Sequence, residues 1–198
     1  MTIYLMRHGE TEWNVAGRLQ GQKDSPLTAR GRAQAAAMGR RLAPLLAVGP
    51  PLTLWASALD RSWHTARLLA AELACDPAAI RRDARLNEQS LGPWDGLTDG
   101  EMMARDEAAW TAWRRPADLW MAAAPGGESR ADMALRARAW LDTIDMSATH
   151  MVVGHGVFNR ILRGVYGGFG RDRVTALESF PHEAILVLER GRETWLDG

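Results

Sequence analysis

The chain has 198 residues, 46% of them apolar, with 24 basic and 24 acidic side chains, so it suits one domain spanning 1–198 and is too apolar to be intrinsically disordered. Zero net charge gives no global attraction to nucleic acid, and the single cysteine, Cys75, excludes an internal disulfide and a thiolate metal cluster. No run approaches the ~20 apolar residues of a membrane helix and no signal peptide is recognisable, so we expect a cytoplasmic protein without a membrane partner.

Hydrophobic runs and turn signals predict strands that alternate with helices. The first half begins with a short buried strand at 3–6. A turn and N-cap at 25–28 then begin a helix that continues to about Leu42. A strand at 52–55 and a helix at 61–74 follow. A less regular strand follows at 80–86. The second half has a strand at 150–153, a helix at 158–165 and a last buried strand at 184–188. This alternation predicts an α/β fold of three layers, α/β/α, around a mostly parallel sheet.

Residues 98–125 differ from the rest, because they hold Trp110, Trp113, Trp120 and several methionines among charged side chains. The segment predicts short helices, with glycine-containing turns at 95–96 and 125–127 at its two ends. Such residues at helical spacing often serve only for packing. The alternative is a small helical lid inserted over the sheet edge, covering an apolar part of a substrate.

Three polar residues directly follow or end predicted strands: His8, Ser57 and His155. Sites in parallel α/β sheets form outside the carboxyl ends of the strands, so one sheet edge can collect all three. An imidazole held there can act as a base, a metal ligand or a nucleophile. Arg7 precedes the first histidine, and Arg61 lies in the first turn of a helix, whose N-terminus favours an anion. These residue types indicate a phosphate site.

Other candidate motifs are excluded. The glycine-rich stretch 164–170 follows a helix rather than a strand, which is the wrong order for a dinucleotide-binding turn. The chain has no G-x-x-x-x-G-K-[ST] loop and no H-E-x-x-H sequence.

The motifs together resemble the histidine phosphatase superfamily, in its phosphoglycerate-mutase-like branch. The opening at 5–14 (LMRHGETEWN) is the most specific part, and 17–21 (GRLQG) and 24–31 (DSPLTARG) continue it. The segments 57–66, 86–88 with 92–96, 125–129 and 152–156 follow in order. Two positions depart from the family pattern: His64 stands where Gln or Arg is more usual, and His182 where Asn is expected. We expect both to alter the rim of the pocket.

The resemblance implies a role for each matching residue. His8 is the nucleophile that takes the phosphoryl group, and Arg7, Arg61 and His155 hold and neutralise it. Asn14, Gln20, Gly21 and the Gly156 backbone line the pocket. Glu88 is protonated at first, donates to the leaving oxygen and then acts as the base on water. The arginines supply the charge, so neither a metal nor another cofactor is expected.

The resemblance implies a metal-independent phosphatase that hydrolyses small phosphorylated metabolites through phosphohistidine. A phosphoglycerate mutase is the alternative, but mutases of this family carry Glu-Arg-x-Tyr-Gly where this chain has residues 88–92 (EQSLG), and they are longer. A non-catalytic phospholigand-binding module and a metal hydrolase built on His8 and His155 are further alternatives. The oligomeric state stays open, with a homodimer as one choice.

Overall fold

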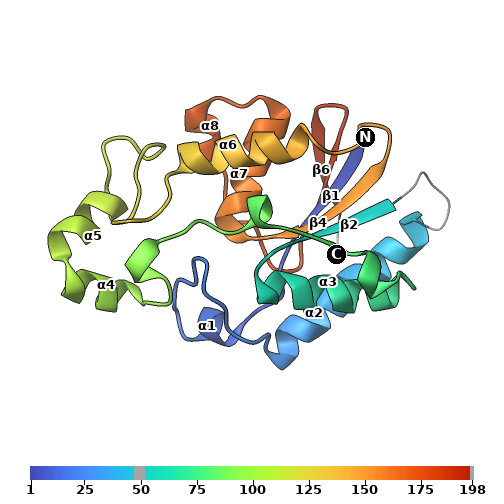
Figure 1. The fold of residues 1–198 in the computed structure, drawn as a ribbon, viewed down its shortest axis with the longest axis horizontal. Coiled ribbons are helices and arrows are strands. Elements are labelled where there is room, and N and C mark those ends of the chain that lie inside the picture. The colour runs from blue at the N-terminus through green and yellow to red at the C-terminus, as the bar shows by residue number, and fades with distance from the viewer. Residues whose placement is uncertain (47–51, 197–198) are drawn as a thin grey trace.

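A six-stranded sheet forms the centre of the computed structural model, which describes residues 1–46 and 52–196 (Figure 1). The strands are β1 (Thr2–Arg7), β2 (Leu52–Ser57), β3 (Arg81–Asp83), β4 (Thr149–Gly154), β5 (Ile185–Glu189) and β6 (Arg192–Leu196). Their order is β3-β2-β4-β1-β5-β6. The first four of these neighbours pair in parallel, whereas β5 and β6 join antiparallel at one edge. The mostly parallel α/β sheet predicted from the sequence is therefore confirmed.

Helices cover both faces of this sheet. The α-helices of the described residues are α1 (Glu12–Val15), α2 (Ala29–Leu46), α3 (Asp60–Glu72), α4 (Asp99–Arg105), α5 (Glu107–Arg114), α6 (Arg130–Leu141), α7 (Gly156–Gly167) and α8 (Arg171–Ala176). Short 3-10 segments are η1 (Pro77–Ala79), η2 (Ala84–Leu86) and η3 (Gly92–Trp94). In Figure 1, α2 and α3 lie on one side of the sheet and α6, α7 and α8 on the other, which gives three layers.

Each face of the sheet has its own hydrophobic core, because side chains alternate along a strand. In β1, Ile3 and Leu5 pack with α6 and α7, whereas Met6 packs with α2 and α3. In β4, Val152 belongs to the first core, and Met151 belongs to the second. The central strands are thus buried on both faces, which fixes the position of the residues at their carboxyl ends.

The structure corrects the strand predicted at 80–86 and adds elements that the sequence analysis missed. Only Arg81–Asp83 pairs as a strand, and it ends there because the Asp83 side chain accepts a hydrogen bond from the Arg85 amide and begins the 3-10 turn η2. Helix α6 and strand β6 were not predicted. The capping box between Ser129 and Asp132 is a sequence signal that could have located the start of α6.

Residues 98–125 contain the two short helices α4 and α5, which lie at the left of Figure 1, beyond the helices that cover the sheet. They enclose a third, small core around Trp94 and Met102, both of which are buried. Trp113 packs edge-on against Trp94 with ring centroids 5.8 Å apart. Packing thus accounts for part of this aromatic segment, while Trp113 also lines the site cavity described below.

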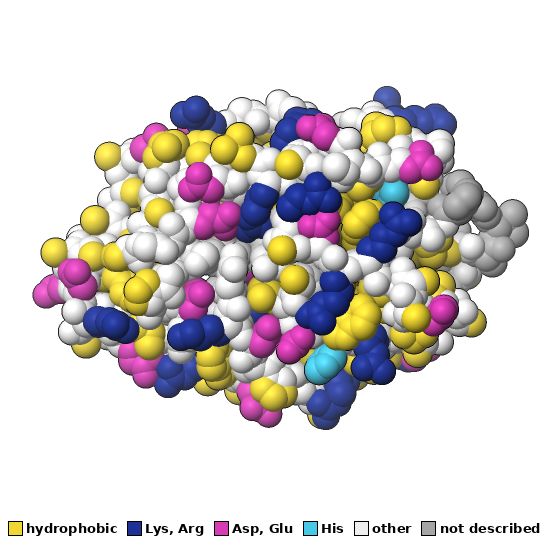
Figure 2. All heavy atoms as spheres, viewed as in Figure 1, with side chains coloured by type: hydrophobic (Ala, Val, Ile, Leu, Met, Phe, Trp, Pro, Cys, Tyr) yellow, Lys and Arg dark blue, Asp and Glu magenta, His cyan; other side chains and the backbone are white. Residues whose placement is uncertain are grey.

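The face shown in Figure 2 carries basic and acidic side chains in a mixed pattern, as zero net charge leads one to expect. Among the described residues, no helix combines the length and apolarity needed to cross a membrane.

Candidate active site

A cavity of about 310 Å³ lies at the carboxyl ends of the central strands. Its lining includes most of the residues singled out from the sequence, namely Arg7, His8, Asn14, Gln20, Gly21, Arg61, Glu88 and Gly156. His155 is completely buried just behind this lining, with its ring centroid 5.2 Å from that of His8. The three strand ends named in the sequence analysis thus meet at one edge of the sheet.

The imidazole of His8 is held in one orientation directly after β1. Its Nδ1 lies 2.8 Å from the carbonyl oxygen of Gly9, so Nδ1 carries the proton and donates it to that oxygen. This leaves Nε2 with the lone pair. Burial, followed by the positive charges of Arg61 and Arg7, holds the pKa of His8 well below its usual range. His8 is therefore a neutral imidazole with a nucleophilic nitrogen at neutral pH.

Arg61 comes from the first turn of α3 and is 1% exposed. Its Nη1 donates to the carbonyl oxygen of Lys23 at 2.6 Å and to Asp24 Oδ1 at 2.8 Å, and its Nη2 donates to the carbonyl oxygen of Gly21 at 2.7 Å. Arg7, the last residue of β1, donates from Nη1 to the carbonyl oxygen of Phe180 at 2.9 Å. Both guanidinium groups are thus fixed by backbone carbonyls, as a rigid anion site requires.

Three buried donors of this cluster have no hydrogen-bond partner among the described residues: Nε of Arg7, Nε of Arg61 and Nδ1 of His155. Buried polar atoms are normally paired, so such a group calls for an explanation. Arg7, Arg61 and His8 line the same cavity, the ring of His155 lies directly behind that of His8, and the charges of both arginines lower the pKa of both histidines. A bound oxyanion would satisfy all three donors.

Glu88 follows η2 and reaches the N-terminus of α7. Its Oε1 accepts hydrogen bonds from the amides of Gln89 at 2.8 Å and Phe158 at 3.0 Å, and its Oε2 accepts one from Val157 at 3.0 Å. Oε1 has both lone pairs occupied, whereas Oε2 keeps one free. Oε2 is therefore the carboxylate oxygen that can bind a proton and exchange it with a ligand in the cavity.

The expected lining residues are held by close packing at the glycines and by hydrogen bonds at Asn14 and Gln20. Gly21 has φ +54°, and a Cβ there would lie 1.5 Å from Asp95 Oδ1, so this turn requires glycine. A Cβ at Gly156 would lie 3.4 Å from the Arg7 guanidinium carbon. Gln20 is buried and accepts a hydrogen bond from Ser25 at 3.2 Å, and Asn14 Oδ1 accepts one from the Thr11 amide at 3.0 Å.

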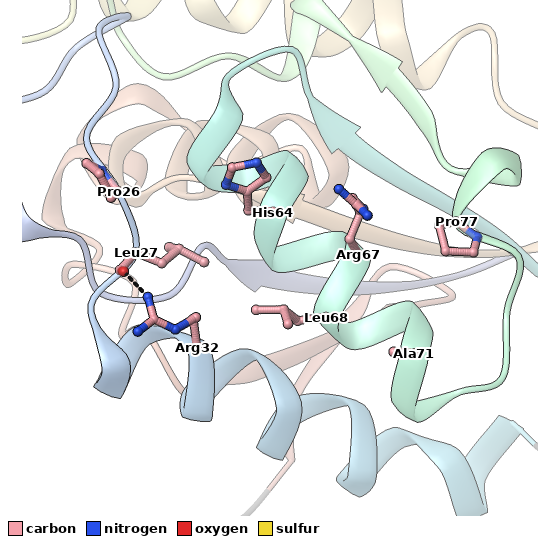
Figure 3. Close-up of a pocket in the computed structure, with 8 residues that line it drawn as sticks. All are labelled: Pro26, Leu27, Arg32, His64, Arg67, Leu68, Ala71 and Pro77. Atoms are coloured by element: carbon pink, nitrogen blue, oxygen red, sulfur yellow. Dashed lines mark hydrogen bonds between the residues drawn. The ribbon is translucent and has the colours of Figure 1, made fainter.

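The two departures from the family pattern lie in different places. His182 is part of the site: its Nδ1 donates to the carbonyl oxygen of His8 at 2.7 Å, and the two rings are 5.5 Å apart. His64 instead faces a separate depression of about 510 Å³ between α2 and α3, together with Arg32 and Arg67 (Figure 3). The expectation that His64 alters the rim of the site is therefore wrong. This depression is larger than the site cavity, but the described residues that line it include no acid, and no nucleophile besides His64.

The sequence analysis also missed several cavity residues, among them Arg114 in α5, Arg130 at the start of α6 and Arg160 in α7. No strand-end rule points to them, since they come from helices. Within residues 1–46 and 52–196, no group of three or more His, Cys, Asp or Glu side chains has an arrangement that could hold a metal ion.

The fold and this site define a class of protein, and comparison with known sequences agrees. The chain belongs to the histidine phosphatase superfamily (branch 1), whose family model matches residues 3–196.

Two relatives show how the family divides. A glucosyl-3-phosphoglycerate phosphatase of Mycobacterium tuberculosis is 40% identical over 136 residues, which cover 69% of this chain and 56% of that protein. The match thus spans little more than half of that relative. A Salmonella paratyphi C protein named "Probable phosphoglycerate mutase GpmB" is 33% identical over 162 residues, which cover 79% of this chain and 70% of that protein.

Solved structures match over nearly the whole chain. A mycobacterial glucosyl-3-phosphoglycerate phosphatase in complex with VO3 superposes with a TM-score of 0.79 at 28% identity, covering 98% of this chain and 96% of that one. The α-ribazole phosphatase from Shigella flexneri gives a TM-score of 0.82 at 26% identity, covering 98% and 94%.

Proposed function

We propose that this protein hydrolyses small phosphomonoesters through a phosphohistidine formed on His8. The observation that carries the proposal is the neutral His8 ring, whose Nδ1–H donates to the Gly9 carbonyl oxygen, together with three nearby buried donors that have no partner among the described residues. Phosphoryl transfer needs little covalent help from a protein beyond positioning and charge stabilisation, which this arrangement supplies. The names of the phosphatase relatives agree with this reaction.

In the first step, His8 Nε2 attacks phosphorus and the bond from phosphorus to the ester oxygen breaks. Arg7, Arg61 and the Nδ1–H of His155 donate to the non-bridging oxygens, where negative charge is held throughout. The proton on Glu88 Oε2 passes to the departing oxygen, so the alcohol leaves neutral.

In the second step, water attacks the phosphorus of phospho-His8. Glu88, now ionised, accepts the proton of that water, and the bond from nitrogen to phosphorus breaks. Inorganic phosphate leaves, and both His8 and Glu88 return to their first state. Asn14, Gln20, Gly21 and Gly156 shape the cavity in which these steps take place.

The test is phosphate release from an aryl phosphate in the presence of a chelator. We expect turnover in the wild type, loss of at least about a thousandfold in His8→Ala, and an acid-labile phosphoryl label on His8 in a quenched reaction. Undiminished turnover in His8→Ala, or the label on another residue, would refute the proposal.

A phosphoglycerate mutase remains the second candidate, because one relative carries that name. The residue after Glu88 is Gln89, which lines the cavity and donates to the Glu128 carbonyl oxygen at 2.7 Å. A mutase-type arginine is thus missing at this position. Isomerisation of phosphoglycerate, measured with and without bisphosphoglycerate, distinguishes the two. Isomerisation much faster than phosphate release would favour the mutase.

A further inference from the structure

Two arginines in the cavity wall differ from their basic neighbours in their polar partners. Arg130 and Arg160 both line the site cavity and are half-buried. Arg160 donates from Nη1 to the carbonyl oxygen of Leu177 at 3.0 Å, and Nη1 of Arg130 is buried without a hydrogen-bond partner in the described chain. In that same part of the chain, neither guanidinium forms an ion pair with a carboxylate.

The other basic residues at the outer wall of the cavity are already neutralised. Arg18 pairs with Glu101 at 2.7 Å, and Arg114 pairs with Asp99. By contrast, neither Arg130 nor Arg160 has a carboxylate at ion-pair distance in the described part of the chain. Burial and then the charge of Arg160 lower the pKa of Arg130, whereas the pKa of Arg160 is lowered by burial and partly restored by the charge of Glu88. A half-buried guanidinium with an unpartnered nitrogen, as in Arg130, is costly for the empty protein, and an oxyanion bound beside it removes that cost.

Arg130 and Arg160 are not among the charges that act most strongly on His8. The strongest charges on His8 are those of Arg61 and Arg7. Arg130 additionally lines a smaller cavity of about 170 Å³ with Gln89, Trp113 and Leu119, where the site continues beneath the segment that follows α5. A ligand whose phosphoryl group lies at His8 would thus extend its other end toward Arg130.

We propose that Arg130 and Arg160 form a second anion subsite, so that the preferred substrates are phosphomonoesters with a carboxylate or a second phosphate at the far end. This inference rests on the proposed phosphatase function for its kinetic test. A guanidinium group can bind either a carboxylate or a phosphate through two parallel hydrogen bonds. The substrates compared below therefore include both kinds of oxyanion.

The test uses two sets of esters, each matched except at the far end. The short set is glycerol 3-phosphate, 3-phosphoglycerate and glycerol 1,3-bisphosphate, and the longer set is phenyl phosphate with a hydroxymethyl, carboxylate or phosphate group at position 4. We expect kcat/KM for an anionic ester to exceed that of its hydroxymethyl analogue by about tenfold or more in at least one set. The carboxylate and phosphate arms show which oxyanion the subsite takes.

Variants then assign any such preference to the two arginines. Arg130→Met should bring the ratio close to one by lowering kcat/KM for the anionic esters more than for their hydroxymethyl analogues, and Arg130→Lys should keep part of the preference. Arg67→Met is the matched control, because it removes one exposed arginine of α3 that does not line this cavity. The subsite is refuted if neither set shows a preference, or if the preference survives in both Arg130→Met and Arg160→Met.

The experiment also separates failure of the subsite proposal from failure of the proposed phosphatase function. If no ester releases phosphate, the proposed function is wrong, and calorimetric titration of the same esters still tests the subsite. Tighter binding of the anionic ester than of its analogue, lost in Arg130→Met, would support it, and equal binding would refute it.

Discussion

Ser57 Oγ and His155 Nε2 lie 2.7 Å apart at the buried ends of β2 and β4. The Ser57 oxygen also accepts a hydrogen bond from the Leu59 amide at 3.2 Å, so its own hydrogen is free to be donated to Nε2. Burial and the nearby arginines hold the pKa of His155 well below its usual range, and the ring is neutral. A neutral ring that accepts at Nε2 carries its proton at Nδ1, the atom without a partner in the described structure. In the mechanism that we propose, Ser57 thereby leaves His155 Nδ1–H free to donate to the phosphoryl group.

Ser57→Ala should therefore weaken catalysis without removing any group that touches the substrate. We expect kcat/KM for an aryl phosphate to fall by about 10- to 100-fold, the worth of one hydrogen bond to a charged group. Nitrogen-15 NMR of the histidines should show that the proton of His155 moves from Nδ1 to Nε2. An unchanged tautomer together with full activity would contradict this role.

The free lone pair on Glu88 Oε2 gives a prediction that depends on the leaving group. In Glu88→Gln, alkyl phosphates should lose about 100- to 10,000-fold in kcat, because their alkoxide requires a proton. A nitrophenyl ester needs little protonation, so it should still phosphorylate His8 and release a burst of one nitrophenol per enzyme before slow turnover. Stopped-flow absorbance measures that burst. Equal losses for both esters without a burst would argue against proton donation by Glu88.

The strand-end residues could be located from sequence because parallel strands present their carboxyl ends at one edge. That rule places His8, Ser57 and His155 together, and the position of Arg61 follows from the first turn of the next helix. The rule does not say which side chains touch. The hydrogen bond from Ser57 to His155 depends on register between β2 and β4, which the sequence alone does not specify.

Other parts of the site depend on long-range packing. His182 reaches His8 from the segment before β5, 174 residues further along the chain. Arg130 and Arg160 enter the cavity because α6 and α7 pack together on one face of the sheet. A single sequence gives no local signal for such long-range contacts, because an arginine near the start of a helix is usually a solvated surface residue.

Asp24 holds the buried guanidinium of Arg61 and also caps the helix that carries it. Its carboxylate accepts hydrogen bonds from the amides of Asp60 at 2.8 Å and Arg61 at 3.2 Å. Asp24→Ala should lower the free energy of unfolding by about 2–4 kcal/mol, since it leaves a buried charge unpaired and a helix uncapped. KM for an aryl phosphate should rise as well. Urea denaturation and steady-state kinetics measure the two effects. Asp24→Asn, which can still cap α3, should lose less stability, and equal losses in both variants would contradict the capping role.

The buried histidines predict how stability depends on pH. His8 and His155 have folded-state pKa values well below 6.5, the value at which they titrate when exposed. As the pH falls below about 6.5, the unfolded chain takes up protons that the folded chain does not, so the free energy of unfolding decreases. Each of these histidines contributes a slope of about 1.4 kcal/mol per pH unit until its folded pKa is reached. Above about pH 6.5, these histidines are neutral in both the folded and the unfolded chain, so their full contribution to the free energy of unfolding is present.

Urea denaturation between pH 7.5 and 5.0 tests this in the wild type and in His155→Gln, which removes one of the two groups. We expect the wild type to lose stability as the pH falls from 6.5, and the variant to lose it with a slope smaller by about 1.4 kcal/mol per pH unit. Inorganic phosphate should reduce the loss in the wild type, because an anion among the arginines offsets their repulsion of a protonated ring. Parallel pH profiles for the two proteins would show that His155 is not held neutral by its surroundings.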